Sequence, residues 1–191
     1  MPFENSKYRI NSGWIEIITG SMFSGKTEEL IRRLKRATIA NQKVVLFKPN
    51  IDKRYSYNKV VSHDKNELES IPVSSITEIL KYINNEEVIA IDEVQFFNEH
   101  IIELAEKLAN EGKRVILAGL DMDYLAKPFN PVPQLMAIAE YVTKIHAICV
   151  KCGNLASFSH RKTSSEKLVE IGAKDAYEPL CRSCYNQIKK D

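Results

Sequence analysis

Hydrophobic residues in this chain gather in short continuous runs, which alternate with stretches of helical periodicity. The four clearest runs are WIEIIT (14–19), KVVLFKP (43–49), VIAIDE (88–93) and RVILAGL (114–120). They lack the period of two that marks a strand exposed on one face, and continuous apolar runs are typical of strands buried on both faces. Because such strands occur mostly in parallel sheets, the pattern predicts a mainly parallel sheet.

Three of the intervening stretches predict amphipathic helices, over residues 26–41, 74–84 and 99–112. The second opens with Ser75 and Glu78 at the spacing of a capping box, and the third closes at Gly112. The apolar stripes of the first two helices consist of Leu30, Ile31, Leu34 and Ala37, and of Ile76, Ile79, Leu80 and Ile83. The alternation of strands and helices predicts an α/β fold in which helices flank the sheet.

Two stretches carry weaker signals. Residues 50–70 are polar, with one possible strand at 59–63. Residues 121–134 hold three prolines, which predicts a loop. A short helix and a strand are expected between residues 133 and 150.

Composition narrows the class of protein. The 191 residues include 27 basic and 25 acidic side chains, a net charge of +2, which argues against a dedicated nucleic-acid surface. Residues 53–59, KRYSYNK, could suit single-stranded nucleic acid, but a solvated loop or a small anion site is favoured. No apolar run has the length of a membrane span, and the first residues do not resemble a signal peptide. We therefore expect a cytoplasmic protein with no membrane or nucleic-acid partner.

Residues 20–27, GSMFSGKT, match the P-loop pattern Gly-x-x-x-x-Gly-Lys-Thr between a predicted strand and a predicted helix. Glycines let the backbone curl so that successive N–H groups point at phosphate oxygens, and the following helix adds the positive end of its dipole. Lys26 would bring a charge to the outer phosphates, and Thr27 a hydroxyl to Mg²⁺. The predicted ATP site consists of Gly20, Ser21, Met22, Phe23, Ser24, Gly25, Lys26 and Thr27.

Asp92 and Glu93 follow the apolar run VIAI. The carboxyl edge of an open α/β sheet is where ligands bind, and neighbouring strand residues point to opposite faces unless the strand is ending. Asp92 fits an acid that orients Mg²⁺, and Glu93 fits a general base that takes a proton from an attacking hydroxyl. Without the phosphate loop, two acids that solvate a strand end would be the better interpretation.

The four cysteines form two C-x-x-C pairs, Cys149 with Cys152 and Cys181 with Cys184. Four thiolates suit tetrahedral Zn²⁺ and leave no ligand position open, so a structural metal is predicted. The interval of 28 residues between the pairs would then be a long loop pinned at both ends. Redox-active thiols and a nucleic-acid-binding zinc ribbon remain as alternatives.

A soft domain boundary is placed near residue 145. Residues 1–145 are predicted to form a P-loop α/β ATP-binding domain, and residues 146–191 a small zinc-binding domain.

The segments TGSMFSGKTEELIRRL, IDEVQFF, LAGLDMDYLAKPF and VEIGAKDAYEPLCRSC, from about Trp14 to Tyr185, resemble the type II thymidine kinase family, which includes the human cytosolic enzyme. The resemblance implies a P-loop NTPase of RecA-like fold with a mainly parallel sheet, and a zinc-ribbon-like domain with a long lasso loop. It also implies transfer of the γ-phosphoryl group of ATP to the 5′-hydroxyl of thymidine or deoxyuridine, and assembly into a homotetramer.

The resemblance further assigns individual residues. Glu93 would be the base on the 5′-hydroxyl, Asp92 would lie in the Mg²⁺ shell, and Arg54 would reach phosphate. The nucleotide site would continue through Val94 and Gln95. The nucleoside site would comprise Met22, Phe97, Leu120, Tyr124, Phe129, Leu168, Val169, Glu170, Ile171, Gly172 and Tyr177.

Two functions of other classes remain as alternatives. One is a nucleic-acid-dependent ATPase, because IDEVQ resembles the acid-pair motif of such motors. The other is a zinc-ribbon adaptor that uses nucleotide as a switch without transferring phosphate.

Overall fold

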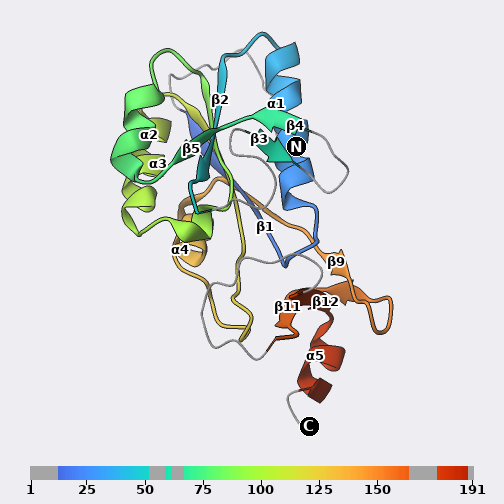
Figure 1. Ribbon diagram of the computed structural model, residues 1–191. Coiled ribbons are helices and arrows are strands. Elements are labelled where there is room, and N and C mark those ends of the chain that lie inside the picture. The colour runs from blue at the N-terminus through green and yellow to red at the C-terminus, as the bar shows by residue number, and fades with distance from the viewer. Residues whose placement is uncertain (1–12, 52–58, 62–66, 164–175, 189–191) are drawn as a thin grey trace.

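The computed structural model describes residues 13–51, 59–61, 67–163 and 176–188, and a six-stranded sheet forms its centre (Figure 1). All strand pairs in this sheet are parallel, as the continuous apolar runs predict. The strand order is β5-β2-β6-β7-β1-β8. The strands are β1 (Trp14–Thr19), β2 (Val44–Pro49), β5 (Ile71–Val73), β6 (Val88–Ile91), β7 (Arg114–Gly119) and β8 (Tyr141–Lys144).

Helices cover both faces of the sheet, which makes an α/β sandwich of three layers (Figure 1). α1 (Lys26–Ile39) lies on one face, beside the short hairpin of β3 (Lys59–Val61) and β4 (Glu67–Glu69). The other face is covered by α2 (Ile76–Tyr82), α3 (His100–Asn110) and α4 (Val132–Ile138). Neighbouring strand residues divide between the two cores, as Ile17 and Ile18 of β1 do.

A smaller unit follows the sheet and packs below it in Figure 1. It contains two antiparallel pairs of strands, β9 with β10 and β11 with β12, and one helix. Cys149, Cys181, Cys184 and the ring of Tyr185 belong to its own core, whereas Cys152 is exposed. The elements are β9 (Ala147–Ile148), β10 (Leu155–Ala156), β11 (Phe158–Arg161), β12 (Tyr177–Leu180) and α5 (Arg182–Ile188).

Several predicted boundaries were wrong. The sequence did not reveal β5, which has only three residues, one of them Pro72, too few for a periodic signal. β6 ends at Ile91, so Asp92 and Glu93 follow the strand and do not belong to it. α4 begins at Val132, inside the stretch predicted as loop, because proline is tolerated in the first turn of a helix.

Two further predictions need correction. The 28-residue interval between the cysteine pairs is not one loop, since β10, β11 and β12 lie within it. The helical pattern predicts that Leu80 belongs to the apolar stripe of α2, but 40% of its surface is exposed, whereas Ile79 is fully buried. The cap of that helix was predicted correctly in part, because Ser75 Oγ accepts the N–H of Glu78 at 3.3 Å.

No helix in the described part of the chain is long and apolar enough to cross a membrane. The domain boundary near residue 145 stays a prediction. It falls directly after β8, which ends at Lys144.

A buried ion-pair network ties α1 to strands β1 and β7. Glu16 of β1 accepts hydrogen bonds from Arg33 Nη1 at 2.7 Å, Arg114 Nε at 2.6 Å and Trp14 Nε1 at 2.8 Å. Burial raises the pKa of the Glu16 carboxyl, but hydrogen bonds from Arg114 and Trp14 and the charges of both arginines outweigh it and hold the pKa below its ordinary value of 4.5. The network therefore stabilises the fold above that pH, and the stabilisation is lost as the pH falls through the folded-state pKa.

We expect Glu16→Gln to lower the free energy of unfolding by about 3 kcal/mol at pH 7, because it leaves two arginines without their buried partner. The difference from wild type should be smaller at about pH 3 than at pH 7, because the ionised wild-type carboxyl loses its stabilising effect as the pH falls through its folded-state pKa, which lies below 4.5. Urea unfolding at both pH values measures this. Glu103→Gln is the matched control, since the Glu103 side chain is 78% exposed in its pair with His100. A loss as small as that of the control, or one that does not depend on pH, would contradict the prediction.

Candidate active site and metal cluster

The phosphate loop joins the end of β1 to α1 at the carboxyl edge of the sheet. It begins at Gly20, whose φ is +144°, and a Cβ at this position would lie 2.0 Å from the carbonyl oxygen of Ile145. Ile145 also donates its N–H to Thr19 O at 2.8 Å, so the chain that leaves β8 runs directly against the start of the loop. Only glycine fits this backbone angle and this close approach.

The loop curls around the ammonium group of Lys26. Lys26 Nζ donates to Ser21 O at 2.9 Å, and the side chain is buried. Phe23 and Gly25 both have positive φ, 64° and 88°, within a loop that reverses direction before the helix. Alternation between left-handed and right-handed backbone turns successive N–H groups inward, the geometry that binds anions. The amino end of α1 adds its positive dipole to the same place.

Asp92 lies beside the first turn of α1, although β7 separates β6 from β1 in the sheet. Thr27 Oγ1 donates to Asp92 Oδ2 at 3.3 Å, and the N–H of Glu93 donates to Asp92 Oδ1 at 2.9 Å. A hydroxyl and a carboxylate so close together are the oxygen ligands that Mg²⁺ takes at phosphate sites. The residues present therefore fit Mg²⁺.

Glu93 has a strained backbone that turns its side chain out of line with β6. Its φ of 50° and ψ of 44° are left-handed, which is unusual for any residue except glycine, asparagine and aspartate. Gln95 Nε2 donates to the Glu93 carboxylate, and Gln95 Oε1 accepts the N–H of Leu120 at 3.1 Å. Gln95 is buried and thus connects the Glu93 carboxylate to the end of β7. Strain of this kind gathers at functional sites.

Close packing fixes this arrangement. A Cβ on Gly119 would lie 2.7 Å from Val94 Cγ1 and 2.8 Å from Gln95 Oε1. Val94 is fully buried in the core on the α3 side, so its side chain is not exposed to a bound nucleotide. Of the two residues that the resemblance added after Glu93, Gln95 contacts Glu93 directly, whereas Val94 supports it from the core.

The segment between β7 and α4 follows the carboxyl end of β7 and carries Leu120, Tyr124 and Phe129. Asp123 Oδ1 accepts the N–H groups of Leu125 and Lys127 at 2.9 Å each and holds the segment in a turn. The ring of Phe129 packs edge-on against Phe96, with ring centroids 6.5 Å apart. Phe97 is 9% exposed and belongs to the core on the α3 side.

Some predicted residues lie outside the described part of the chain. They are Arg54, Leu168, Val169, Glu170, Ile171 and Gly172. Tyr177 is described and begins β12, where it is buried.

The smaller unit contacts the phosphate loop, which no pattern in the sequence predicts. Ser21 Oγ donates to Ala156 O at 3.2 Å, and Ser159 Oγ accepts the N–H of Met22 at 2.9 Å. Ser159 is a buried residue of β11 and lies 137 positions from Met22 in the chain. No local pattern could have indicated such a contact.

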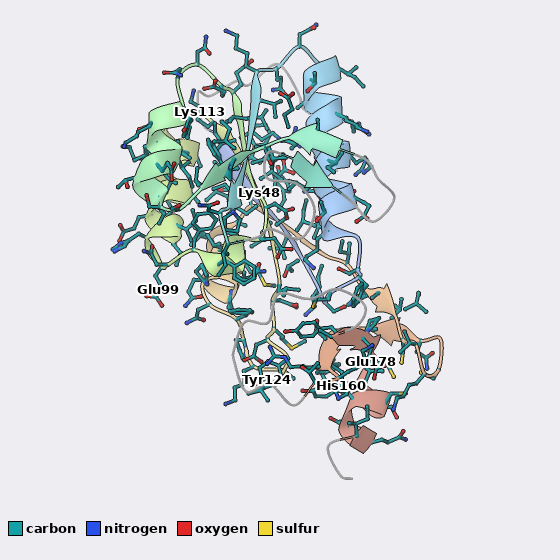
Figure 2. The ribbon with its side chains drawn as sticks, viewed as in Figure 1. Lys48, Glu99, Lys113, Tyr124, His160 and Glu178 are labelled. Carbon is teal, nitrogen blue, oxygen red and sulfur yellow. The ribbon has the colours of Figure 1, made fainter. Side chains whose placement is uncertain are left out.

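Lys48 was also missed, and here a signal existed. It is a buried lysine near the carboxyl end of β2, next to β6, and Figure 2 labels it near the middle of the sheet. The N–H of Asp92 donates to the carbonyl of Phe47 at 2.9 Å, so Lys48 lies one residue from a direct contact with the acid pair. Lys48 directly follows the apolar run VVLF, and the run VIAIDE ends at the same edge of the sheet. A charged residue at the end of a buried strand could have indicated that Lys48 lies near the acid pair.

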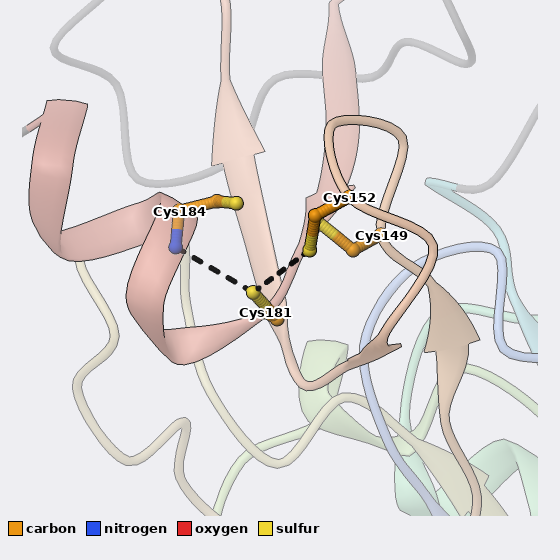
Figure 3. A group of neighbouring side chains, drawn as sticks. All are labelled: Cys149, Cys152, Cys181 and Cys184. Atoms are coloured by element: carbon orange, nitrogen blue, oxygen red, sulfur yellow. Dashed lines mark hydrogen bonds between the residues drawn. The ribbon is translucent and has the colours of Figure 1, made fainter.

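The four cysteines come together as predicted (Figure 3). Their sulfur atoms all lie within 4.8 Å of one another, and those of Cys152 and Cys181 are 3.5 Å apart. Tetrahedral zinc thiolates with bonds of about 2.3 Å place their sulfurs about 3.8 Å apart. The cluster therefore fits a tetrahedral Zn²⁺ with four protein ligands and no open position.

Local structure holds both pairs. The N–H of Gly153 donates to Cys149 O at 2.9 Å and closes the first turn, and the N–H of Cys184 donates to Cys181 Sγ at 3.5 Å at the start of α5. Burial raises the pKa of Cys149, but backbone hydrogen bonds at Cys181, Lys151 and Cys152 outweigh it and lower the pKa to about 6. The sulfurs of Cys152 and Cys181 raise the pKa of Cys184 to about 12. Four sulfurs this close cannot all be thiolates unless a cation balances their charge.

Comparisons with known proteins agree with one another. The family model for thymidine kinase matches residues 13–185. A thymidine kinase of Rhodothermus sp. (strain ITI 518) is 57% identical over 173 residues, which cover 91% of this chain and 81% of that protein. The thymidine kinase of Bacteroides thetaiotaomicron is 58% identical over 173 residues, 91% of this chain and 87% of that protein. The thymidine kinase of Porphyromonas gingivalis is 54% identical over 178 residues, with coverages of 93% and 87%.

Proposed function

The chain belongs to the thymidine kinase family, and on this premise we propose that it transfers the γ-phosphoryl group of ATP to the 5′-hydroxyl of thymidine, or of deoxyuridine. One observation supports this reaction above others. A single edge of the sheet gathers a phosphate loop, a carboxylate with a strained backbone and an aromatic segment, from three separate parts of the chain. A kinase for a small hydroxyl compound needs these three parts: an anion cradle, a base and an apolar slot.

The phosphate end of the site would work by charge. The N–H groups of residues 20–25 and the ammonium group of Lys26 would hold the phosphates of ATP. Thr27 and Asp92 would hold Mg²⁺, which neutralises charge on the phosphates when bound. Arg54 is proposed as a further phosphate ligand on the resemblance alone. These groups act by positioning and by stabilising charge on the transferring phosphoryl group, so little covalent help is required.

Glu93 is proposed as the general base. Its carboxylate would accept the proton of the 5′-hydroxyl as the oxygen attacks the γ-phosphorus. Gln95 would hold the carboxylate in place through the hydrogen bond described above, and the left-handed backbone at Glu93 would aim it. The buried amide of Gln95 contacts both the Glu93 carboxylate and the N–H of Leu120. It would therefore connect the base to the segment that binds the nucleoside.

The nucleoside would lie against apolar and aromatic side chains. Tyr124, Phe129 and Leu120 come from one segment and would form one side of the slot, with Met22, Phe97 and Tyr177 around it. Residues 168–172 are proposed to read the polar edge of the base through their backbone. Uncharged N–H and C=O groups can match the pattern of oxygen and N–H on a pyrimidine.

The cysteine cluster is proposed as a structural zinc site in a domain comprising residues 146–191. Its support is the closed set of four sulfurs, which leaves no position for substrate. The homotetramer and the cytoplasmic location expected from the resemblance and from the sequence stay predictions.

A direct transfer assay tests the proposed function. The protein is incubated with Mg²⁺, γ-labelled ATP and each deoxynucleoside in turn, with and without DNA. We expect label in thymidine monophosphate and in deoxyuridine monophosphate, and little in the cytidine or purine products. ATP hydrolysis that depends on DNA, with no labelled nucleotide, would favour the motor. Nucleotide binding without transfer or hydrolysis would favour the adaptor.

A further inference from the structure

Strand β11 lies between the metal cluster and the active-site edge, and its residues alternate between the two. Phe158 faces α5, where its ring stacks on Tyr185 with centroids 4.6 Å apart. Ser159 faces the other way and accepts the N–H of Met22 in the phosphate loop. Because residues two apart on a strand share a face, Arg161 lies on the same side as Ser159.

Arg161 makes an unusually complete set of contacts for a buried cation. Arg161 is one of the buried charged residues of the protein, and only 6% of its surface is exposed. The guanidinium carbon lies 3.6 Å from the centroid of the Tyr124 ring, while Nε and Nη2 donate to the hydroxyl of Tyr177 at 3.1 and 2.6 Å. A planar guanidinium can stack on one ring and donate from its edge to another group, which a lysine ammonium cannot do.

The two tyrosines come from distant segments. Tyr124 follows β7, and its carbonyl accepts the hydroxyl of Tyr185 at 2.9 Å, so this residue is held at its ring and at its backbone. Tyr177 begins β12 and is the register partner of Arg161 on β11. Figure 2 shows Tyr124 beside the unit that carries His160 and Glu178 of the same two strands.

We propose that Arg161 is a positioning residue for the nucleoside, whose guanidinium fixes the rings of Tyr124 and Tyr177 as one rigid wall of the base slot. The inference rests on the proposed function, which places both tyrosines at that slot. Arg161 acts through the two rings and does not touch the reacting atoms. A wall that is ordered before the nucleoside arrives lowers the cost of binding it. The loss of Arg161 should therefore appear in nucleoside binding and leave ATP binding unchanged.

The first test is Arg161→Lys, which keeps the buried charge and removes the planar fork. We expect KM for thymidine to rise about 10-fold while kcat stays within about 3-fold of wild type, because a wall that must be ordered on binding costs affinity and not chemistry. KM for ATP should not change. Arg182→Lys is the matched control, since Arg182 is exposed and its guanidinium carbon lies 5.0 Å from the centroid of the Phe158 ring in the same unit. A rise in both KM values, or an equal rise in the control, would overturn the proposal.

A double-variant cycle tests whether Arg161 acts through Tyr177. Tyr177→Phe keeps the ring and removes the hydroxyl that Arg161 holds. If the wall is one unit, the double variant with Arg161→Lys should raise KM for thymidine no further than the worse single variant. Effects that multiply would mean that the two residues act independently, and this would overturn the proposed coupling.

Deuterium exchange separates this inference from the proposed function. Backbone amides of residues 120–129 should exchange faster in Arg161→Lys than in wild type, whatever substrate the enzyme uses. Unchanged exchange there would contradict the inference even in an active thymidine kinase. Conversely, a wild-type protein that labels no thymidine would contradict the proposed function, while faster exchange in the variant would still support Arg161 as the residue that fixes this segment.

Discussion

Glu93→Gln is expected to lower kcat about 1,000-fold, within the range that general-base catalysis contributes, while the dissociation constant for ATP stays within about 3-fold of wild type. Glutamine has nearly the same shape as glutamate, but its amide cannot accept the proton of the 5′-hydroxyl. The Gln95 contact can persist with the amide oxygen as acceptor, so the substitution removes the base and leaves its surroundings in place. Steady-state transfer to thymidine and equilibrium binding of ATP measure the two quantities.

Glu99→Gln provides the control for this experiment. Glu99 is exposed and precedes α3, six positions from Glu93, and Figure 2 labels it at the periphery of the fold. The same chemical change there should leave kcat unaltered. If Glu93→Gln kept near wild-type turnover, Glu93 would no longer be a candidate for the base. If it lost ATP binding as well, the residue would belong to the nucleotide site.

Removal of the proposed zinc ion is expected to have the largest effect on stability. A structural zinc site contributes on the order of 10 kcal/mol at neutral pH, which is comparable to the whole stability of an ordinary domain. Cys184→Ser, or dialysis of the wild type against a chelator, should therefore unfold the unit that contains β9 to β12. Transfer activity should fall with it, because Ser159 and Ala156 of this unit contact the phosphate loop.

The measurements are metal content per chain, limited proteolysis and transfer activity. We expect one zinc ion per chain in the wild type and less than one in Cys184→Ser. Ser183→Ala is the matched control, because Ser183 is exposed and lies between Cys181 and Cys184 without being a ligand candidate. Full activity of a zinc-free wild type, or equal zinc content in both variants, would contradict a structural zinc. A change in activity only under oxidising conditions would favour redox-active thiols.

Local patterns accounted for most of the sheet and for the chemistry at its edge. Long apolar runs located β1, β2 and β7 to within about one residue, since continuous burial leaves a strong signal. The phosphate loop and the two cysteine pairs were recognisable because their residues are adjacent in sequence. The short strand β5 was not, because three residues with a proline carry no period.

Contacts between distant segments were beyond reach for a different reason. Ser159 and Arg161 have their roles because β11 packs against the phosphate loop and the Tyr124 segment, and neither residue type is unusual where it stands in the sequence. The conformation of Glu93 was hidden in the same way, since VIAIDE is compatible with a strand through residue 93. Packing of the core around Val94 and Gly119 decides that the strand ends earlier.

The left-handed backbone at Glu93 has a consequence for selection. An ordinary residue in this conformation costs about 1–2 kcal/mol that glycine does not incur. Glycine at position 93 would remove this strain, but it would also remove the carboxylate that Gln95 Nε2 contacts. Relief of backbone strain and turnover therefore favour different residues at this one position. An ancestral or consensus reconstruction that keeps glutamate there would indicate that turnover, and not persistence of the fold, has been the stronger constraint.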